Sequence, residues 1–137
     1  MEQVCILPYM QYDEMEILNL YKSVGWSNYY ERPEMLRNAF ENSLGTLGAY
    51  CGDKLVGIIR VVGDGHSIIY IQDLRILPEY QHTKFGTRLL TAILEKFKNV
   101  YQKVLVTDRT EKTVNFYESL GFTELTEIGC VAFLLRN

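Results

Sequence analysis

The spacing of apolar residues predicts an N-terminal strand followed by two helices. Residues 4–7 form a short apolar run of the kind found in edge strands. Asp13 and Glu16 have the spacing of a capping box, which predicts that a helix begins beside them. Pro33 fits the first turn of a second helix, because proline lacks the amide that a first turn leaves unbonded. The apolar positions that recur at helical spacing are Ile17, Leu20, Tyr21 and Val24 in the first helix and Leu36, Ala39 and Phe40 in the second.

In the middle of the chain the pattern changes to that of strands. Residues 46–51 and 55–62 read as two strands, and the Gly-Asp-Lys sequence of residues 52–54 predicts a hairpin turn between them. Residues 68–76 predict a third, longer strand, which Pro78 ends. These runs predict an antiparallel meander.

The C-terminal part predicts two further helices and the remaining strands. Residues 104–106 predict a short buried strand between the helices, and Thr110 is placed to cap the second helix. Gly121 stands where a helix ends in a left-handed residue. Residues 130–135 predict a last strand, with residues 123–127 as a further candidate. The earlier of these two C-terminal helices has about four turns. Its apolar stripe consists of Phe85, Leu89, Leu90, Ile93, Leu94 and Phe97.

These elements predict one α/β domain over residues 1–137. We expect a mixed, mostly antiparallel sheet of about six or seven strands with about four helices. The strand–helix–strand crossover near the C-terminus should be right-handed, which makes its two strands parallel.

Composition excludes several classes of protein. The net charge of −3 shows no basic footprint for nucleic acid. The three scattered cysteines fit a reducing compartment better than a disulfide framework, and we read no signal peptide, so we expect a cytoplasmic protein. No apolar run approaches the ~18 residues that span a membrane. The two histidines, His66 and His82, lack metal-ligand spacing, so we expect no metal site.

Residues 71–90 carry the clearest chemical signal. A strand leads into a tight loop and then into a helix, whose first turn has unbonded amides and a positive dipole end that favour phosphate oxygens. Gly86 allows close approach of a ligand, Thr83 and Thr87 add hydroxyl donors, and Lys84 adds positive charge. A polyphosphate site is one interpretation, and an ordinary strand–helix connection is the other. Neither a dinucleotide-binding nor a P-loop glycine pattern is present.

Two local motifs resemble the GNAT superfamily of acetyltransferases. The sequence ILPEYQHTKFGTRLL resembles that family's acetyl-CoA loop, with Gln81 at its opening Gln/Arg position and Gly86 at its last glycine. The sequence NFYESLGF, residues 115–122, resembles the end of the family's F-Y-x-x-x-G-F helix. Lys84 and His82 depart from the small residues usual in the loop, and Lys84 is tolerable there if its φ stays negative.

The resemblance implies a GNAT fold and acetyl-CoA as co-substrate. The strand of residues 68–76 is expected to splay from residues 104–106, so that the pantetheine arm lies in the split and a backbone amide polarises the thioester carbonyl. The cofactor-binding residues that the resemblance implies are Leu74, Ile76, Gln81, His82, Thr83, Lys84, Phe85, Gly86, Thr87 and Phe116.

The resemblance also implies catalytic residues. Tyr117 occupies the position of the tyrosine that donates a proton to the leaving thiolate, although in isolation it reads as a core tyrosine. Asp73 is the carboxylate candidate for a general base, with backbone bonding or loop capping as an equal alternative. Tyr70 and Gln72 share one face of their strand and are expected to line the amine pocket. Asp73 faces the other way unless a bulge intervenes.

The segment between the two N-terminal helices covers the acceptor site in similar proteins. Trp26, Tyr29 and Tyr30 could form an aromatic wall for an alkyl or aryl amine, or a cation–π seat, or a satellite core. We therefore expect an N-acetyltransferase that uses a small primary amine through a ternary complex, as a monomer or homodimer. The alternatives are a protein-lysine or N-terminal acetyltransferase and a non-catalytic acyl-CoA-binding module.

Overall fold

The structure is a computed structural model that describes residues 4–23 and 27–136. The chain divides into two compact units, residues 1–105 and residues 106–137, and each is described by itself.

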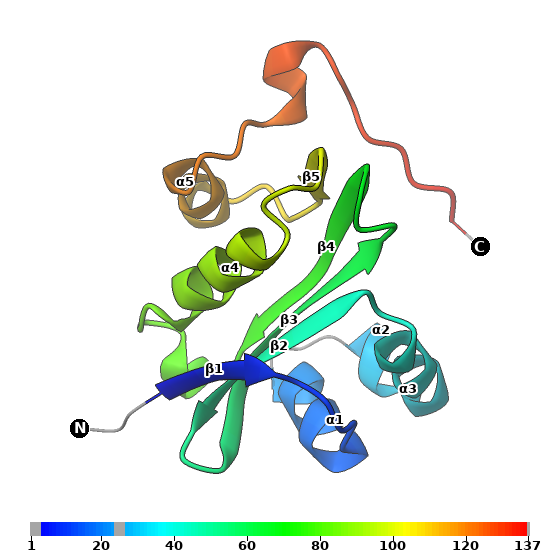
Figure 1. Cartoon of the computed structure of the whole chain (residues 1–137), viewed down its shortest axis with the longest axis vertical. Coiled ribbons are helices and arrows are strands. Elements are labelled where there is room, and N and C mark those ends of the chain that lie inside the picture. Colours follow the sequence, from blue (N-terminus) through cyan, green and yellow to red (C-terminus); the bar gives the residue numbers. More distant parts are fainter. Residues whose placement is uncertain (1–3, 24–26, 137) are drawn as a thin grey trace. The chain divides into compact units, whose positions relative to one another are not determined.

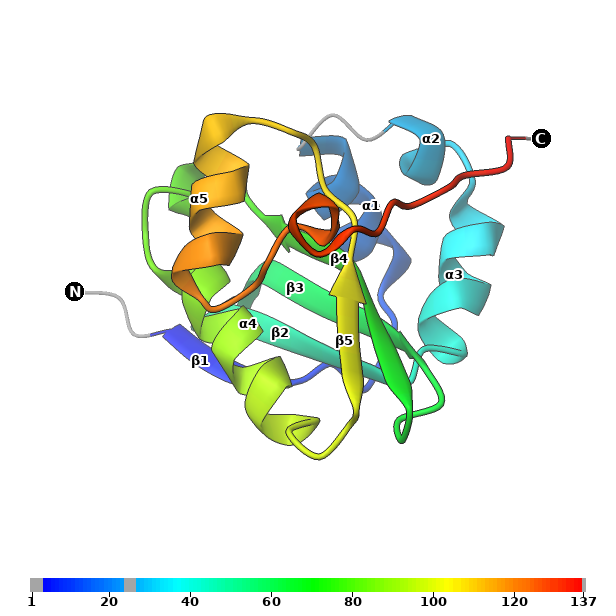
Figure 2. The same cartoon turned by 90° about the horizontal axis from the view of Figure 1, so that it is seen from above.

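The first unit is built on a five-stranded mixed sheet (Figure 1). Strands β1 to β4 pair with their neighbours in antiparallel fashion, and β5 pairs with β4 in parallel, as the crossover predicted. Figure 2 shows β5 beside β4 at one edge of the sheet. The strands, in their spatial order, are β1 (Val4–Pro8), β2 (Gly45–Cys51), β3 (Lys54–Gly63), β4 (Ile68–Ile76) and β5 (Gln102–Leu105).

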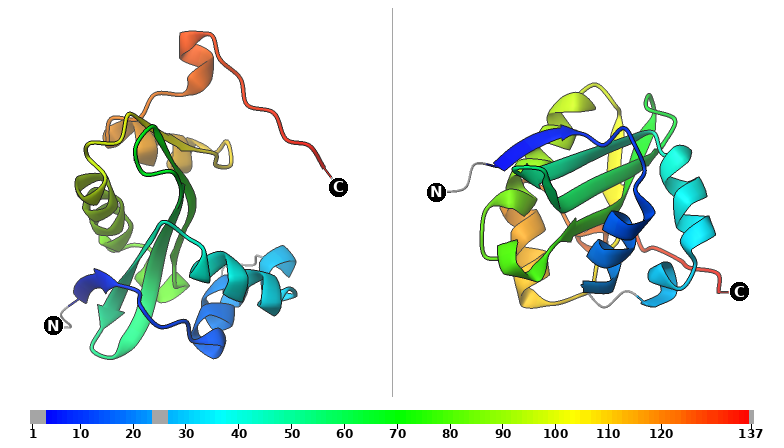
Figure 3. Two further views of the ribbon diagram at one scale, coloured as in Figure 1. Left: turned by 45° about the vertical axis from the view of Figure 1, so that its right-hand side comes forward. Right: turned by 90° about the horizontal axis from the view of Figure 1, so that it is seen from below.

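Helices cover both faces of this sheet. The helices α1 (Glu14–Ser23), α2 (Ser27–Tyr30) and α3 (Pro33–Glu41) lie on one face, and α4 (Phe85–Lys96) lies on the other (Figures 1 and 3). The apolar stripe of α4 is the reason for its position, because burial of such side chains drives helix packing. The side chains with no exposed surface include Ile17, Leu36, Ile58, Ile59, Ile69, Leu89, Leu90 and Ile93.

Local signals at the ends of these elements act as the sequence predicted. Asp13 accepts a hydrogen bond from the amide of Glu16 at 3.1 Å, and Pro33 opens α3. Gly52, in the β2–β3 turn, has a φ of +62°, a conformation that glycine adopts at little cost. The bounds of β4 match the predicted residues 68–76.

The second unit contains α5 (Glu111–Ser119), whose two ends are capped as expected. The Thr110 hydroxyl accepts a hydrogen bond from the amide of Thr113 at 3.1 Å. At the other end Gly121 has a φ of +96°, and its amide donates to the carbonyl of Glu118 at 3.1 Å. The amide of Phe122 donates to the carbonyl of Tyr117 at 3.1 Å, which completes a Schellman motif.

Two predicted strands are wrong. Residues 123–127 contribute instead to a 3₁₀ helix, η2 (Leu125–Ile128), which Gly129 ends at a φ of +79°. Residues 130–136 run as an extended trace (Figure 3). Residues 131–136 make no backbone hydrogen bond to another described residue, and a strand requires such a ladder.

The predicted sheet of six or seven strands is therefore corrected to five among the described residues. The helices number five rather than about four over the same residues, because the short α2 was not predicted. The strand predicted at residues 104–106 is β5, which starts earlier, ends at Leu105 and is only half-buried.

Candidate active site

The start of α4 presents backbone amides in the way the sequence predicted. Lys84 is the N-cap residue, with a φ of −93°, and its side chain makes no capping bond. The amide of Phe85 lies 3.4 Å from the Thr83 hydroxyl, whereas the amides of Gly86 and Thr87 donate to no acceptor within the described part of the chain. Two unbonded amides at the positive end of a twelve-residue helix are suited to anionic oxygens.

The loop before α4 is braced by its own side chains. The side-chain amide of Gln81 donates to the carbonyl oxygen of Ile76 at 3.0 Å. The Thr83 hydroxyl donates to the carbonyl of Tyr80, and the Tyr80 ring lies 5.8 Å from that of Phe85. Gln81 and Thr83 therefore hold the loop in shape. The side chains of His82 and Lys84 are exposed, so both are accessible to a ligand.

Strand β4 loses its neighbour on the β5 side halfway along its length. The parallel pairing of β4 with β5 ends where Ile71 faces Leu105. Leu74 and Ile76 lie beyond that point, and on their other side they pair with Ile59 and Gly57 of β3. No described strand of the first unit flanks this half of β4 on the β5 side. The split that the resemblance implied beside Leu74 and Ile76 stays a prediction.

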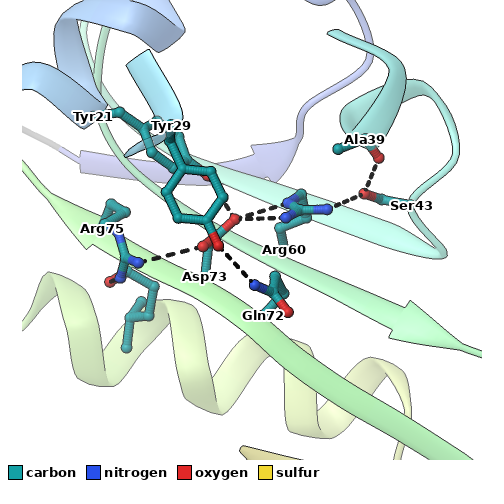
Figure 4. A network of polar contacts seen from close by, with 9 residues as sticks. Tyr21, Tyr29, Ala39, Ser43, Arg60, Gln72, Asp73 and Arg75 are labelled. Carbon is teal, nitrogen blue, oxygen red and sulfur yellow. Dashed lines mark hydrogen bonds and ion pairs between the residues drawn. The ribbon is translucent and has the colours of Figure 1, made fainter. Parts of the chain in front are cut away.

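The carboxylate of Asp73 lies at the centre of a buried polar network (Figure 4). Its Oδ2 atom accepts hydrogen bonds from the Tyr21 phenol at 2.7 Å and from Arg60 Nε at 2.9 Å. Arg60 Nη2 lies 2.8 Å from the same oxygen, and Arg75 Nη2 lies 3.3 Å from Oδ1. Asp73 is 1% exposed and Arg60 is 5% exposed, so the charges are paired away from water.

A β-bulge explains how Asp73 reaches this position. Arg60 pairs with Asp73, but Val61 pairs with Ile71, so Gln72 is an additional residue on β4. Gln72 and Asp73 both reach side chains of the N-terminal helices: the Gln72 amide donates to the Tyr29 hydroxyl at 3.0 Å. The bulge that the sequence left open is thus present.

The predicted acceptor residues partly gather on this side of β4. Tyr29, Tyr30, Tyr70 and Gln72 are each half-buried. Burial raises the pKa of Tyr70, and the Tyr29 and Asp73 groups raise it further. The hydrogen bond between Gln72 and Tyr29 is the contact that brings two of the predicted residues together. Trp26 lies outside the described residues.

Tyr21, Arg60 and Arg75 were not among the predicted site residues. Burial, and then the Asp73 carboxylate, raise the pKa of Tyr21 far above its usual value, so its phenol is a neutral donor. One signal in the sequence could have indicated a partner for Asp73: Arg60 is the only charged residue in the apolar run 55–62, and a buried arginine needs an anion.

Tyr117 and Phe116 lie on α5 in the second unit. The Tyr117 ring lies 5.0 Å from the Phe116 ring and 5.8 Å from the Phe122 ring, in edge-on contacts. Tyr117 is half-buried. The roles of Tyr117 and Phe116 towards a thioester therefore stay predictions.

Metal-binding clusters and membrane-spanning helices are absent from the described residues. They contain no group of three or more His, Cys, Asp or Glu side chains placed to hold a metal ion. No helix among them combines the length and the apolar character that crossing a membrane requires.

Comparisons with known proteins give one consistent result. Residues 11–135 match the acetyltransferase (GNAT) domain family. A ycf52-like N-acetyltransferase of Prochlorococcus marinus is 32% identical over 116 residues, which are 81% of this chain. The chain spans 63% of the length of that curated relative.

Solved structures extend the comparison. A GNAT-family acetyltransferase from Streptococcus pneumoniae TIGR4 is 40% identical, with a TM-score of 0.90 and coverage of 98% of both chains. The PaiA N-acetyltransferase from Thermoplasma acidophilum was solved in complex with coenzyme A. It is 22% identical, has a TM-score of 0.70, and the match covers 88% of this chain and 90% of that chain, so its likeness shows the fold.

Proposed function

Because this chain belongs to the GNAT family of acetyltransferases and is an acyltransferase enzyme, we propose that it transfers the acetyl group of acetyl-CoA to the primary amine of a small molecule. The observation that carries this proposal is the pair of α4 amides with no acceptor among the described residues, together with the half of β4 that no described strand flanks on the β5 side. The coenzyme A complex of the distant Thermoplasma relative supports the choice of co-substrate.

The residues of the α4 loop fit a pyrophosphate. The amides of Gly86 and Thr87 would bind its oxygens, and the exposed ammonium of Lys84 would add a charge. We assign His82 to the same phosphate side, and Gln81, Thr83 and Phe85 to the shape of the loop. The pantetheine arm would follow β4 through the backbone of Leu74 and Ile76, and Phe116 would contact the same arm.

Acetyl-CoA supplies an activated thioester, and the chain's own groups orient the attack on it. The free amine attacks the carbonyl carbon, a C–N bond forms, the C–S bond breaks, and coenzyme A leaves as a thiolate. A backbone amide of β4 near Leu74 stabilises the negative charge on the carbonyl oxygen. We propose that Tyr117 gives its phenolic proton to the thiolate, in keeping with its position in the F-Y motif, and that the proton lost by the attacking nitrogen as the amide forms restores the phenol through water.

The contacts of Asp73 bear on its predicted role as the base. Both of its oxygens already accept bonds from Arg60, Arg75 or Tyr21, and the residue is 1% exposed. These contacts disfavour direct proton abstraction by Asp73. They are contacts to side chains, not the backbone bond or loop cap that the sequence left open as the alternative. We therefore propose that the proton of the acceptor ammonium leaves through water.

The acceptor is proposed to bind against Tyr29, Tyr30, Tyr70 and Gln72, with Trp26 as a further candidate. Aromatic faces and one amide suit an amine with an apolar or aryl body. We also propose that the enzyme is a homodimer, since residues 131–135 expose large apolar side chains. The cytoplasmic location remains a prediction from the cysteine pattern.

The test is an acetylation assay on the full chain. The protein is incubated with acetyl-CoA and one of three acceptors, 2-phenylethylamine, spermidine or a lysine-containing peptide, and thiol release is measured. We expect release with 2-phenylethylamine. Tyr117→Phe should lower kcat by about 100-fold with unchanged acetyl-CoA affinity, while the control Tyr101→Phe, at a tyrosine that is 86% exposed, should match the wild type.

Each other outcome contradicts a stated part of the proposal. Coenzyme A binding without thiol release on any acceptor would indicate a non-catalytic module. Release with the peptide alone would indicate a protein acetyltransferase. Full turnover in Tyr117→Phe would remove Tyr117 from the mechanism.

A further inference from the structure

Four side chains form a closed ring of contacts between β4 and the helices α1 and α2 (Figure 4). Asp73 accepts from Tyr21 at 2.7 Å, and Gln72 donates to Tyr29 at 3.0 Å. The rings of Tyr21 and Tyr29 lie 5.6 Å apart with an interplanar angle of 55°. Gln72 and Asp73 are consecutive residues, so the ring closes through the backbone of the bulge.

The charged groups behind the ring keep Asp73 from turning away. Arg60 holds Oδ2 through two nitrogens, and Arg75 holds Oδ1. Arg60 also donates to the Ser43 hydroxyl at 3.2 Å, and Ser43 donates to the carbonyl of Ala39 on α3 at 2.6 Å. The oxygen that receives the Tyr21 phenol is therefore fixed with respect to β3, β4 and α3.

We infer that Tyr21, Arg60 and Asp73 are positioning residues that set the acceptor wall, Tyr29 and Gln72, against the thioester. The inference rests on the proposed function, in which the thioester lies beside Leu74, the residue that follows Asp73. A shift of the wall should weaken the binding of the amine and misalign it for attack, because both depend on near-contact geometry. The network fixes the wall and does not touch the reacting atoms.

The inference predicts different effects on the binding of the two substrates. Tyr21 lies on α1 and bonds to Asp73, which also bonds to Arg60 of β3, whereas the proposed phosphate site lies at the start of α4. Loss of the Tyr21 hydroxyl should therefore change the binding of the amine and leave the binding of acetyl-CoA unchanged. The phenyl ring that remains can still pack against Tyr29 and against Phe40, whose ring lies 6.3 Å away.

The experiment compares Tyr21→Phe, Gln72→Met and the double variant, with Tyr101→Phe as control. Steady-state kinetics with 2-phenylethylamine should show a KM for the amine that rises about tenfold in Tyr21→Phe. The KM for acetyl-CoA should stay within about twofold of wild type. The amine KM of the double variant should be close to that of the worse single variant, because the two residues act through one ring.

Two results would overturn the inference. An acetyl-CoA KM that rises in parallel with the amine KM would show general destabilisation. Strictly additive effects of the two substitutions would show two independent contacts.

A second measurement keeps the network testable if none of the acceptors reacts, which would be a failure of the proposed function. Amide hydrogen exchange of Tyr21→Phe should be faster in α1 and unchanged in α4, because the lost bond anchors only the N-terminal helices. Exchange that is unchanged in α1, or faster in both helices, would refute a local positioning role for Tyr21.

Discussion

Asp64 is the residue around which the turn between β3 and β4 is built. Its Oδ1 atom accepts hydrogen bonds from the amides of His66 at 2.7 Å, Ser67 at 2.8 Å and Ile68 at 3.2 Å. The Ser67 hydroxyl donates to Oδ2. Gly63, just before it, has a φ of +136°, and a Cβ atom there would lie 2.4 Å from the carbonyl oxygen of Ile68. The two residues together fix where β4 begins.

The carboxylate of Asp64 should make stability depend on pH. The bond from the Ser67 hydroxyl, followed by those from the amides, lowers the pKa of Asp64 below its ordinary value of 3.8. A carboxyl group with a lowered folded-state pKa stabilises the fold fully above its unfolded-state pKa and less as the pH falls through the folded-state value. We expect the stability difference between wild type and Asp64→Ala to be constant above about pH 5 and to shrink below about pH 4.

Urea unfolding at several pH values measures this difference. Ser67→Ala should weaken the pH dependence, because it removes the largest cause of the lowered pKa. A difference between wild type and Asp64→Ala that grows as the pH falls would contradict the prediction.

Elements that carry their own boundary signals were the ones that the sequence predicted well. The predicted bounds of β4 agree with the structure, and three residues of the α4 stripe, Leu89, Leu90 and Ile93, are fully buried. Gly121 ends α5 as expected. The helix α2 has only four residues, which is too short to show a helical period.

What the sequence could not predict depends on contacts between distant residues. Residues 130–135 have the composition of a strand, but composition does not show whether a ladder partner is present. Similarly, the sequence left two roles open for Asp73, that of a general base and that of a backbone or loop contact. It did not show that Arg60 of β3 lies opposite Asp73. That pairing passes through the bulge at Gln72, and no local signal in the sequence marks the bulge.

The loop before α4 departs from the family pattern at Lys84, and this departure can be tested. The φ of Lys84 is negative, so the residue replaces glycine without backbone strain. If its ammonium contacts the pyrophosphate, Lys84→Ala should lose about 1 kcal/mol of binding, or about fivefold in Kd for coenzyme A. Titration calorimetry at low and high salt measures the change, which should become smaller at high salt.

Lys98→Ala is the matched control for this loop. Lys98 is also exposed but lies beyond the C-terminal end of α4, where it pairs with Glu95 at 3.3 Å. Its removal should leave the Kd for coenzyme A unchanged. An unchanged Kd in Lys84→Ala at low salt would show that the backbone amides alone bind the phosphates.

At the scale of the whole molecule, the family match bears on how the two units work. Residues 11–135 include β4 and the α4 loop from the first unit and Tyr117 from the second. One family model therefore spans residues of both units. We therefore propose that residues 1–137 act as one catalytic domain.

The apolar side chains of residues 131–135 lead to a prediction about assembly. Val131 is 63% exposed, and Phe133, Leu134 and Leu135 are each more than 80% exposed. Single proteins rarely leave so many adjacent large apolar side chains in water. The backbone of residues 131–136, which bonds to no other residue that the structure describes, can also pair with another chain. In the pure protein a second copy of this chain is always present, so we expect it to cover these side chains.

We expect light scattering after size exclusion to give the wild type twice the 15.9 kDa mass of one chain. The double variant Phe133→Asp, Leu135→Asp should give the mass of one chain, because a buried unpaired carboxylate is far more costly than an exposed one. Tyr101→Asp changes an exposed aromatic residue elsewhere and should leave the mass of the wild type. A wild-type mass of one chain at all concentrations, or a double variant that keeps twice that mass, would show that these residues do not hold two copies together.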